Sequence, residues 1–470
     1  NAGEIDGEQT ICYKTEASEL GSISEASDYG GTLEYQWQSN TTSSTFTFED
    51  IIGASSNTYS PGALTLTSWF RRLARVSCKD DWTGAAESNM VKITIDPLPE
   101  ATAGGSTTIC VSSEATVSGA SSANGDIIWT SNGSGSITAE TSLSPTYTAA
   151  AGDSGNTVIL TMTVTSNNTC GTATATATYT VYVDPLTVAG SISGNDSTIV
   201  HTTTGDLTLS GQTGNVLQWE KKLNDGEWAI ISGTAAATYS ETPETVGEWY
   251  YRALVQSGVC SSTYTSDYMV EVIPDVPEHF TLASPGTATA GYASGNFVIS
   301  LFDQYDNPTY CRANTTFNLS TNSTSSTHIF TPASPLQMGT GTYSSTFTYT
   351  ESKAGTHNIT ASYVSGSSGL TGETLTVSIT VTLPVPWVQT SIGASNGTTE
   401  FFPEVNAGTY KQTAQGLSAP KTDVMNFVYQ QLCGNGTVIA RLSDVVNGGW
   451  AGVMMRESNA PGAKTILFKT

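Results

Sequence analysis

The chain has 470 residues, of which only 12% are charged, and its 41 acidic and 17 basic side chains give a formal net charge of −24 at pH 7. Since about 25% charged residues is usual in soluble domains, the 75 threonines and 57 serines supply most of the polar surface. The few charged side chains are mostly carboxylates, which would repel a nucleic acid or an anionic membrane, so these partners are excluded. The 9% of aromatic residues exclude a disordered chain, the length is enough for several domains, and no apolar run reaches the roughly 18 residues that cross a membrane.

Tandem repeats are visible from the start of the chain. Three tryptophans each precede a cysteine by 41 residues, and a Thr-Tyr dipeptide lies inside each interval. The pairs are Trp37 and Cys78, Trp129 and Cys170, and Trp219 and Cys260. A similar segment precedes each interval: GEQTIC at 7–12, GSTTIC at 105–110 and NDSTIV at 195–200. The sequence therefore predicts a tandem array with a period near 90 residues.

Each repeat has the pattern of β-strands. Segments at 91–96, 172–184 and 268–274 alternate apolar and polar residues and are rich in Val, Ile, Thr and Tyr. Turn-forming residues recur about every 8 to 12 positions, as in antiparallel sandwiches. We therefore predict an all-β fold of tandem immunoglobulin-like sandwiches. The residues expected to fill the cores between the sheets are Trp37, Trp129 and Trp219.

Prolines that end strand-like runs mark the predicted domain boundaries. They are Pro97, Pro185, Pro274 and Pro384. The expected domains are three immunoglobulin-like repeats at 1–97, 98–185 and 186–275, a fourth domain at 276–384 and a fifth at 385–470. Short proline-bearing links stiffen a string of domains. The array is therefore expected to be an extended rod.

The cysteines indicate an oxidising compartment, because two of them recur in each of the first two repeats. The predicted disulfides are Cys12 with Cys78 and Cys110 with Cys170. In the third repeat Val200 stands in place of the first cysteine. The cysteines left unpaired are Cys260, Cys311 and Cys433. For these, a buried thiol and a disulfide to another domain or chain both stay open, whereas the absence of CxxC motifs disfavours a metal site.

The first three repeats carry a family resemblance. Segments YQWQ at 35–38, FEDIIGASSNTYSPG at 48–62 and SWFRRLARVSC at 68–78 resemble the immunoglobulin-like repeats of giant surface adhesins of gliding and filamentous Bacteroidota. Segment IIWTSNGSGSI at 127–137 is similar to their PKD-like variant. The resemblance implies a scaffold without catalytic residues, secreted by the type IX route to the cell surface.

The fourth domain lacks the Trp and Cys signature. Its apolar strand leads into a turn at 303–308 and resembles the repeats of invasin-type adhesins. Asp303 and Asp306 in this turn are candidate calcium ligands. A calcium site needs six to eight oxygens, however, and Asp and Asn are ordinary turn formers, so the turn is the favoured interpretation and no cofactor is expected.

The fifth segment resembles the start of a concanavalin-like sandwich, in FVYQQLCGNGTVIARL at 427–442 and GWAGVMMRESNAPGAK at 449–464. Such folds often bind carbohydrate, although Arg456 and Glu457 fit an ion pair of a sheet equally well. A complete domain of this kind needs about twice the residues present. We therefore expect the chain to be part of a longer protein.

No catalytic motif is present. The four histidines, His201, His279, His328 and His357, lie in no HExxH motif, and neither GxSxG nor a phosphate-binding loop occurs. Ten Asn-x-Ser/Thr sequons are present, and in a chain this rich in Ser, Thr and Asn many of them arise from the composition. Segment 196–198 resembles an O-glycan acceptor of Bacteroidota, which makes Ser197 a candidate glycosylation site.

These observations predict a structural or adhesive segment of a large secreted surface protein, with surface glycans or other cells as partners. Two alternatives stay open. One is a subunit of a homo-oligomeric extracellular filament or hook, and the other is a carbohydrate-binding module array of a secreted polysaccharide-degrading enzyme.

Overall fold

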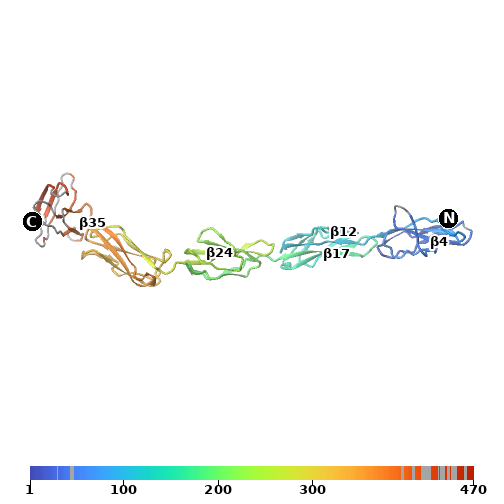
Figure 1. Cartoon of the computed structure of the whole chain (residues 1–470), viewed down its shortest axis with the longest axis horizontal. Helices are drawn as coiled ribbons and strands as arrows, with labels where there is room; N and C mark the ends of the chain where they lie inside the picture. The colour runs from blue at the N-terminus through green and yellow to red at the C-terminus, as the bar shows by residue number, and fades with distance from the viewer. Residues whose placement is uncertain are drawn as a thin grey trace. The chain divides into compact units, whose positions relative to one another are not determined.

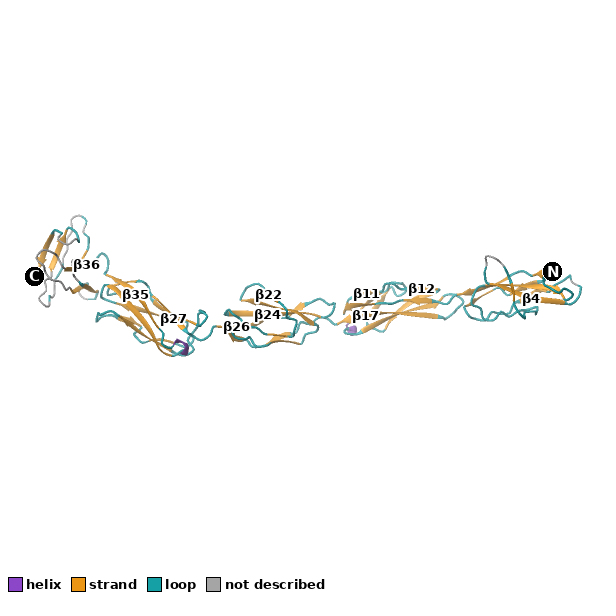
Figure 2. Ribbon diagram, viewed as in Figure 1, coloured by secondary structure: helices purple, strands orange, loops and turns teal. Residues whose placement is uncertain are grey.

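The computed structural model describes residues 1–392 apart from 29 and 43–46, and then 396–404, 408–413, 425–431, 433, 440, 441, 445, 452–459 and 463–469. Regular structure in this part is β-strand, apart from two three-residue 3-10 turns at Ala151–Asp153 and Ser368–Leu370 (Figure 2). The all-β prediction is confirmed. None of the described helical turns is long and apolar enough to cross a membrane.

Contacts divide the chain into two compact units. The first comprises Asn1–Gly194, Asp206–Tyr239 and Tyr250–Met269, and the second Asn195–Gly205, Ser240–Trp249 and Val270–Thr470. We use repeat 1 for residues 1–97, repeat 2 for 98–185 and repeat 3 for 186–275. Their exact boundaries, and the extended rod, stay predictions.

Repeat 1 has one large and one small sheet. The large sheet has the order β2-β8-β6-β4-β5 with β7 beside β6, and the small sheet pairs β1 with β3. The bounds are β1 Glu4–Asp6, β2 Gln9–Cys12, β3 Gly21–Ser24, β4 Leu33–Asn40, β5 Glu49–Asp50, β6 Ser68–Val76, β7 Ala86–Glu87 and β8 Val91–Asp96. Strand β2 runs parallel to β8, whereas the other pairs are antiparallel.

Repeat 2 has sheets β10-β17-β16-β13, β11-β15-β14 and β12-β9. Its strands are β9 Glu100–Thr102, β10 Ser106–Cys110, β11 Glu114–Thr116, β12 Ser121–Ala123, β13 Gly125–Ser131, β14 Ser136–Thr138, β15 Thr146–Thr148, β16 Thr157–Ser166 and β17 Thr174–Asp184. As in repeat 1, the strand that ends in the first cysteine, β10, runs parallel to the last strand, β17. The two repeats therefore share a topology around the site described below.

Repeat 3 has sheets β18-β20-β23 and β19-β26-β24-β21-β22, with β25 beside β24. Its strands are β18 Ser191–Ser193, β19 Ser197–Ile199, β20 Leu207–Ser210, β21 Asn215–Leu223, β22 Ala229–Ile231, β23 Thr238–Tyr239, β24 Gly247–Gln256, β25 Thr263–Tyr264 and β26 Tyr268–Ile273. Strand β19 again runs parallel to the last strand, β26.

The fourth domain packs sheet β27-β29-β33-β31 and sheet β28-β35-β34-β30-β32 around one apolar core. Its strands are β27 His279–Ala283, β28 Thr287–Thr289, β29 Phe297–Phe302, β30 Thr315–Thr321, β31 Ile329–Thr331, β32 Leu336–Met338, β33 Ser344–Thr350, β34 Gly355–Ser365 and β35 Thr374–Thr382. Beyond it, the described residues form the strand pairs β36-β39, β37-β38 and β40-β41. Their bounds are β36 Val388–Ile392, β37 Thr398–Phe402, β38 Thr409–Thr413, β39 Met425–Tyr429, β40 Gly452–Arg456 and β41 Thr465–Lys469.

The three tryptophans are buried in the cores of their repeats. Trp37, Trp129 and Trp219 are 0%, 1% and 0% exposed. Each indole N–H donates to a backbone carbonyl, at 2.8, 3.0 and 2.9 Å respectively. The Thr-Tyr dipeptide supplies a ring that packs against the indole in repeats 1 and 3, with centroid distances of 5.7 Å to Tyr59 and 5.8 Å to Tyr239. A buried indole with its N–H satisfied is a stable core arrangement.

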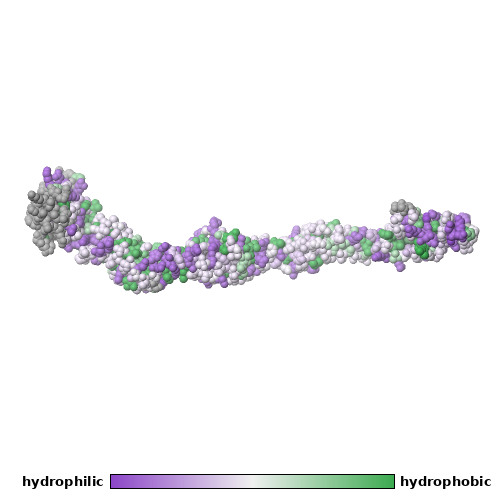
Figure 3. Space-filling model, in the orientation of Figure 1, coloured by the Kyte–Doolittle hydropathy of each residue, from purple (hydrophilic) through white to green (hydrophobic). Residues whose placement is uncertain are grey.

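Threonine and serine cover the strands. In β16, Val158, Leu160, Met162 and Val164 face the core at 0–1% exposure, and four of the five residues that alternate with them are threonines. The visible face of the molecule is accordingly dominated by hydrophilic and near-neutral residues, with hydrophobic ones in scattered groups (Figure 3). The low charge of the sequence is therefore compatible with a folded, water-exposed sheet surface.

Candidate functional site: the disulfide-bonded joints

Two disulfides are present, and both join consecutive repeats. They connect Cys12 with Cys170 and Cys110 with Cys260, with Cα–Cα distances of 4.6 and 4.9 Å. The predicted pairs Cys12–Cys78 and Cys110–Cys170 are therefore wrong. So is the expectation that Cys260 is unpaired, since the free cysteine of this set is Cys78.

Strand directions explain the error. Cys12 ends β2 and lies opposite Asp96, the last residue of the parallel strand β8. Strand β6 runs antiparallel to β8, with Ser68 opposite the third residue of β8. Val76 stands eight residues after Ser68 in β6, which at about 3.4 Å per residue places it roughly 27 Å from Ser68 toward the other end of the sheet. Cys78 lies beyond Val76. A disulfide needs Cα atoms about 4.4 to 6.8 Å apart, so these two cysteines of one repeat cannot meet.

We call the end of a repeat near its last strand residue the exit end, and the opposite end the entry end. Cys12 and Cys110 lie at exit ends, beside Asp96 and Asp184 in the ladder. Cys170 lies in the loop after β16, at the entry end of repeat 2. Each bridge thus joins the exit end of one repeat to the entry end of the next, and both lie inside the first compact unit.

Hydrogen bonds reinforce the first joint, where the chain passes from repeat 1 into repeat 2 (blue to cyan in Figure 1). The carboxylate of Asp96 accepts from the backbone N–H of Thr169 at 3.0 Å and from its hydroxyl at 2.8 Å. The side-chain amide of Asn168 donates to the carbonyl of Pro97 at 3.0 Å. The residues around Cys170 therefore bind the Asp-Pro segment that leaves repeat 1.

The second joint repeats this chemistry with Asp184. Its carboxylate accepts from the N–H of Val259 at 2.9 Å, and the N–H of Ser257 donates to the Thr187 hydroxyl at 3.0 Å. Gly258 has a φ of +48°, and a Cβ on it would lie 1.8 Å from the Asp184 carboxylate. A glycine is required here both by the backbone conformation and by the close approach of the carboxylate.

The two aspartates were missed as site residues. The sequence indicated only that each Asp-Pro dipeptide ends a strand. A signal was nevertheless present, since Asp96-Pro97 and Asp184-Pro185 recur at equivalent places. Their carboxylates satisfy loop N–H groups that would otherwise lack a partner at the joint.

The joint after repeat 3 has no disulfide. Val200, in place of the cysteine, is buried and donates its N–H to Ile273. Contacts within the second unit are noncovalent. The rings of His201 and Tyr305 have centroids 3.9 Å apart, and Arg312 donates to the carbonyl of Pro274 at 2.6 Å. This joint is held by packing and hydrogen bonds alone.

The candidate calcium ligand Asp303 is a turn residue whose oxygens accept hydrogen bonds. Its buried carboxylate accepts from the backbone N–H groups of Asp275, Tyr305 and Asn307, each at 2.9 Å. Burial favours the protonated acid, but these hydrogen bonds outweigh it and hold the pKa of Asp303 below its ordinary value. Oxygens already facing N–H donors are poorly placed for a cation. Asp306 instead lies 3.2 Å from His279.

The other predicted residues are dispersed. Cys311 is buried and Cys433 exposed, both as free thiols. Ser197, the first residue of β19, is exposed. Arg456 donates to the carbonyl of Ser458 at 3.3 Å. No group of three or more His, Cys, Asp or Glu residues suited to a metal ion occurs in the described part of the chain. Much of 427–464, on which the concanavalin-like interpretation rests, lies outside the described residues.

Comparisons with known proteins add a limited amount. The model of a domain of unknown function, DUF8696, matches residues 1–97 and 188–274, less than half of the chain. No curated protein matches.

Solved structures with similar arrangements share little sequence with this chain. A three-domain fragment of titin has 10% identity and a TM-score of 0.33, over 57% of this chain and 95% of its own. The N-terminal eight Ig domains of Down syndrome cell adhesion molecule have 9% identity and a TM-score of 0.25, over 100% of this chain and 60% of theirs. Scores this low carry no argument, so the fold rests on the strands and sheets described above.

Proposed function

We propose that this chain is a structural and adhesive segment of a large secreted surface protein, in which joined immunoglobulin-like repeats hold a binding region at a distance from the cell. The observation that carries the proposal is the pair of disulfides between consecutive repeats. Such bridges do not crosslink two strands of one sandwich. They hold the facing ends of neighbouring repeats together, which limits how far a joint can open when the chain is under tension.

The two bridges overlap along the chain, and this limits how far it extends. Between Cys12 and Cys260 lie 248 peptide steps, but the shortest covalent path crosses one bridge to Cys170, returns 60 residues to Cys110 and crosses the second bridge. At about 3.5 Å per residue the extended length falls from roughly 870 Å to roughly 210 Å. Most of repeat 1 thus lies outside the load-bearing path.

Single-molecule force spectroscopy of the full chain, held at its two ends, tests this proposal. In oxidised protein we expect residues 12–260 to release no more than about 210 Å of length, and reduction should restore up to about 870 Å. Cys433→Ser removes an exposed thiol outside both bridges and should leave the oxidised trace unchanged. Equal release before and after reduction would contradict the proposed mechanical role.

The disulfides also support a location outside the reducing cytosol, since such bonds persist mainly in oxidising compartments. We propose export to the cell surface of a Bacteroidota-type bacterium by the type IX route, with surface glycans or other cells as partners and no catalytic role for these residues. The homo-oligomeric filament and the carbohydrate-binding array stay alternatives, but no particular contact favours either.

A further inference from the structure

The two joints follow one rule. An exit end presents a strand-terminal cysteine beside an Asp-Pro dipeptide, and the next entry end presents a loop cysteine. The exit-end cysteines Cys12 and Cys110 and the entry-end cysteines Cys170 and Cys260 are all used. This leaves one entry end, that of repeat 1, with its loop cysteine free.

That cysteine is Cys78, which is exposed in the loop that follows β6. It stands 41 residues after the core tryptophan of its repeat, as Cys170 and Cys260 stand after theirs. Thus the same position is bonded to a preceding exit end in repeats 2 and 3. In repeat 1 the equivalent surface is open.

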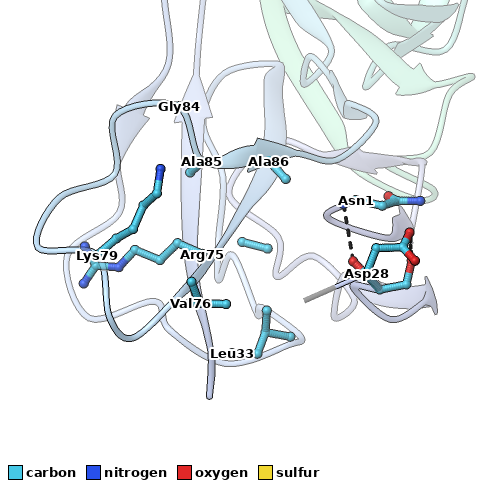
Figure 4. Close-up of a pocket in the computed structure, with 11 residues that line it drawn as sticks. Asn1, Asp28, Leu33, Arg75, Val76, Lys79, Gly84, Ala85 and Ala86 are labelled. Atoms are coloured by element: carbon cyan, nitrogen blue, oxygen red, sulfur yellow. Dashed lines mark hydrogen bonds between the residues drawn. The ribbon is translucent and has the colours of Figure 1, made fainter. Parts of the chain in front are cut away.

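A hollow of about 160 Å³ lies beside this loop. Figure 4 shows Arg75 and Lys79 on one side of it and Asn1 and Asp28 on the other, with Ala85 and Ala86 between. The exposed ammonium of Lys79, next to Cys78, complements the carboxylate that each Asp-Pro exit end brings to its joint. Lys79 therefore offers one opposite charge to an incoming exit-end carboxylate, beside the carboxylate of Asp28 that also lines the hollow.

The chain position of Asn1 agrees with this. Asn1 lines the hollow and stands eleven residues before Cys12, and Pro99 likewise stands eleven residues before Cys110. Pro99 lies within the link that leaves repeat 1. A preceding link would therefore reach repeat 1 at the same hollow.

We propose that the entry end of repeat 1 binds the exit end of a further immunoglobulin-like repeat, carried ahead of residue 1 on the same polypeptide, whose strand-terminal cysteine forms a disulfide with Cys78. A second copy of this chain does not offer that partner, because Cys12 and Cys110 are already bonded and repeat 3 has Val200. The inference goes beyond the proposed function, and the force measurement above does not involve Cys78.

The bond forms by thiol–disulfide exchange. The thiols of Cys78 and of the partner cysteine together lose two protons and two electrons, and a protein disulfide of the oxidising compartment accepts them and becomes a dithiol. The same class of oxidant is needed for the two bridges already present. No additional chemistry is required.

The test places a known exit end ahead of the full chain. A copy of residues 98–188 with its own Cys170→Ser is fused before Asn1, so that its Cys110 is the free exit-end cysteine. After oxidative expression and nonreducing digestion, we expect mass spectrometry to find a peptide joining Cys78 to that cysteine. The bridges Cys12–Cys170 and Cys110–Cys260 of the main chain are internal controls for folding and oxidation.

A matched fusion with Cys78→Ser should lack the linked peptide and keep both internal bridges. The proposal is overturned if Cys78 in the first fusion remains open to alkylation while both internal bridges form. It is also overturned if the unextended chain assembles completely into a dimer bonded through Cys78, because a second copy would then be the partner.

Discussion

Asp153 shows how single residues hold repeat 2 together. Its carboxylate, 2% exposed, accepts from the Tyr147 hydroxyl at 2.7 Å and from the backbone N–H groups of Ser134 at 2.6 Å and Ala150 at 2.8 Å. Burial, with the hydrogen bond to Asp153, raises the pKa of Tyr147 to about 12. For Asp153 burial acts in the opposite sense, but the hydrogen bonds outweigh it and lower its pKa.

The direction of these shifts predicts a pH-dependent loss of stability in Asp153→Asn. Because the folded-state pKa of Asp153 is lowered, its contribution is present above its unfolded pKa of about 3.9 and is lost as the pH falls below it. At pH 7 we expect the substitution to destabilise repeat 2 by about 1–3 kcal/mol, since buried donors lose a charged acceptor. The difference from wild type should shrink toward pH 3.

The stability of repeat 2 within the full chain is measured by the extent to which peroxide oxidises Met162 at increasing urea concentrations. Met162 is 0% exposed in the folded repeat, so its oxidation reports unfolding. Glu114→Gln, an exposed carboxylate in the same repeat, is the matched control and should leave the Met162 transition unchanged. A difference between Asp153→Asn and wild type that is as large at pH 3 as at pH 7 would show that the carboxylate charge is not what matters.

The loop around Gly258 is the element on which the second joint depends. In Gly258→Ala the new methyl group meets the Asp184 carboxylate and the backbone is strained at positive φ. We expect the Cys110–Cys260 bridge to form incompletely, so that thiol titration of denatured protein rises from three toward five per chain. Gly233→Ala, with a φ of +79° but no atom near its Cβ, is the control for strain alone.

If Gly258→Ala and Gly233→Ala give the same thiol count, the close approach to Asp184 is unimportant for the joint. Equal counts of three would point to a loop that adjusts without cost. Equal counts near five would assign the effect to the backbone conformation.

At the scale of strands and loops, the sequence predicted the features that depend on a local residue pattern. The alternation at 172–184 gave the strand β17, Thr174–Asp184, and the tryptophan pattern gave buried indoles. The disulfide pairing depends instead on which end of a sheet each strand reaches. That follows from the parallel pairing of β2 with β8 and of β10 with β17, which no local pattern specifies.

The constant 41-residue spacing identifies corresponding loop cysteines but does not specify the partner of each one. Trp37 lies opposite Arg72 and Trp129 opposite Met162, so the cysteine follows the opposite residue by six positions in repeat 1 and by eight in repeat 2. The segment between the tryptophan and the residue opposite it is correspondingly longer in repeat 1 than in repeat 2, so that the total spacing is the same. A better signal was the setting of Cys170 and Cys260, which stand among Asn, Thr, Gly and Ser, the residues of turns rather than of strand centres.

For the whole molecule, the joints differ in how they respond to reduction. When their bridges are broken, the first two joints retain hydrogen bonds such as those of Asp96 and Asp184, each worth about 1 kcal/mol. The third has no bridge to lose. We therefore expect reduction to make the links at 97–105 and 185–190 cleavable by proteinase K, with little change at 274–278.

Mass spectrometry of the peptides released at early times measures this. The sandwich cores should resist cleavage with or without reductant, because each has its own buried tryptophan or aromatic cluster. Cleavage inside β4, β13 or β21 upon reduction would indicate that the bridges support the repeats themselves rather than the joints.

The bridge between Cys12 and Cys170 also imposes an order on how the protein is made. Cys12 and Cys78 both leave the ribosome or the export channel before Cys170, 158 and 92 residues ahead of it. An unfolded repeat 1 would allow these two to react with each other first. Folding of repeat 1 places Cys12 and Cys78 at opposite ends of a sheet before Cys170 arrives, so the observed pairing is favoured when repeat 1 folds before its cysteines are oxidised.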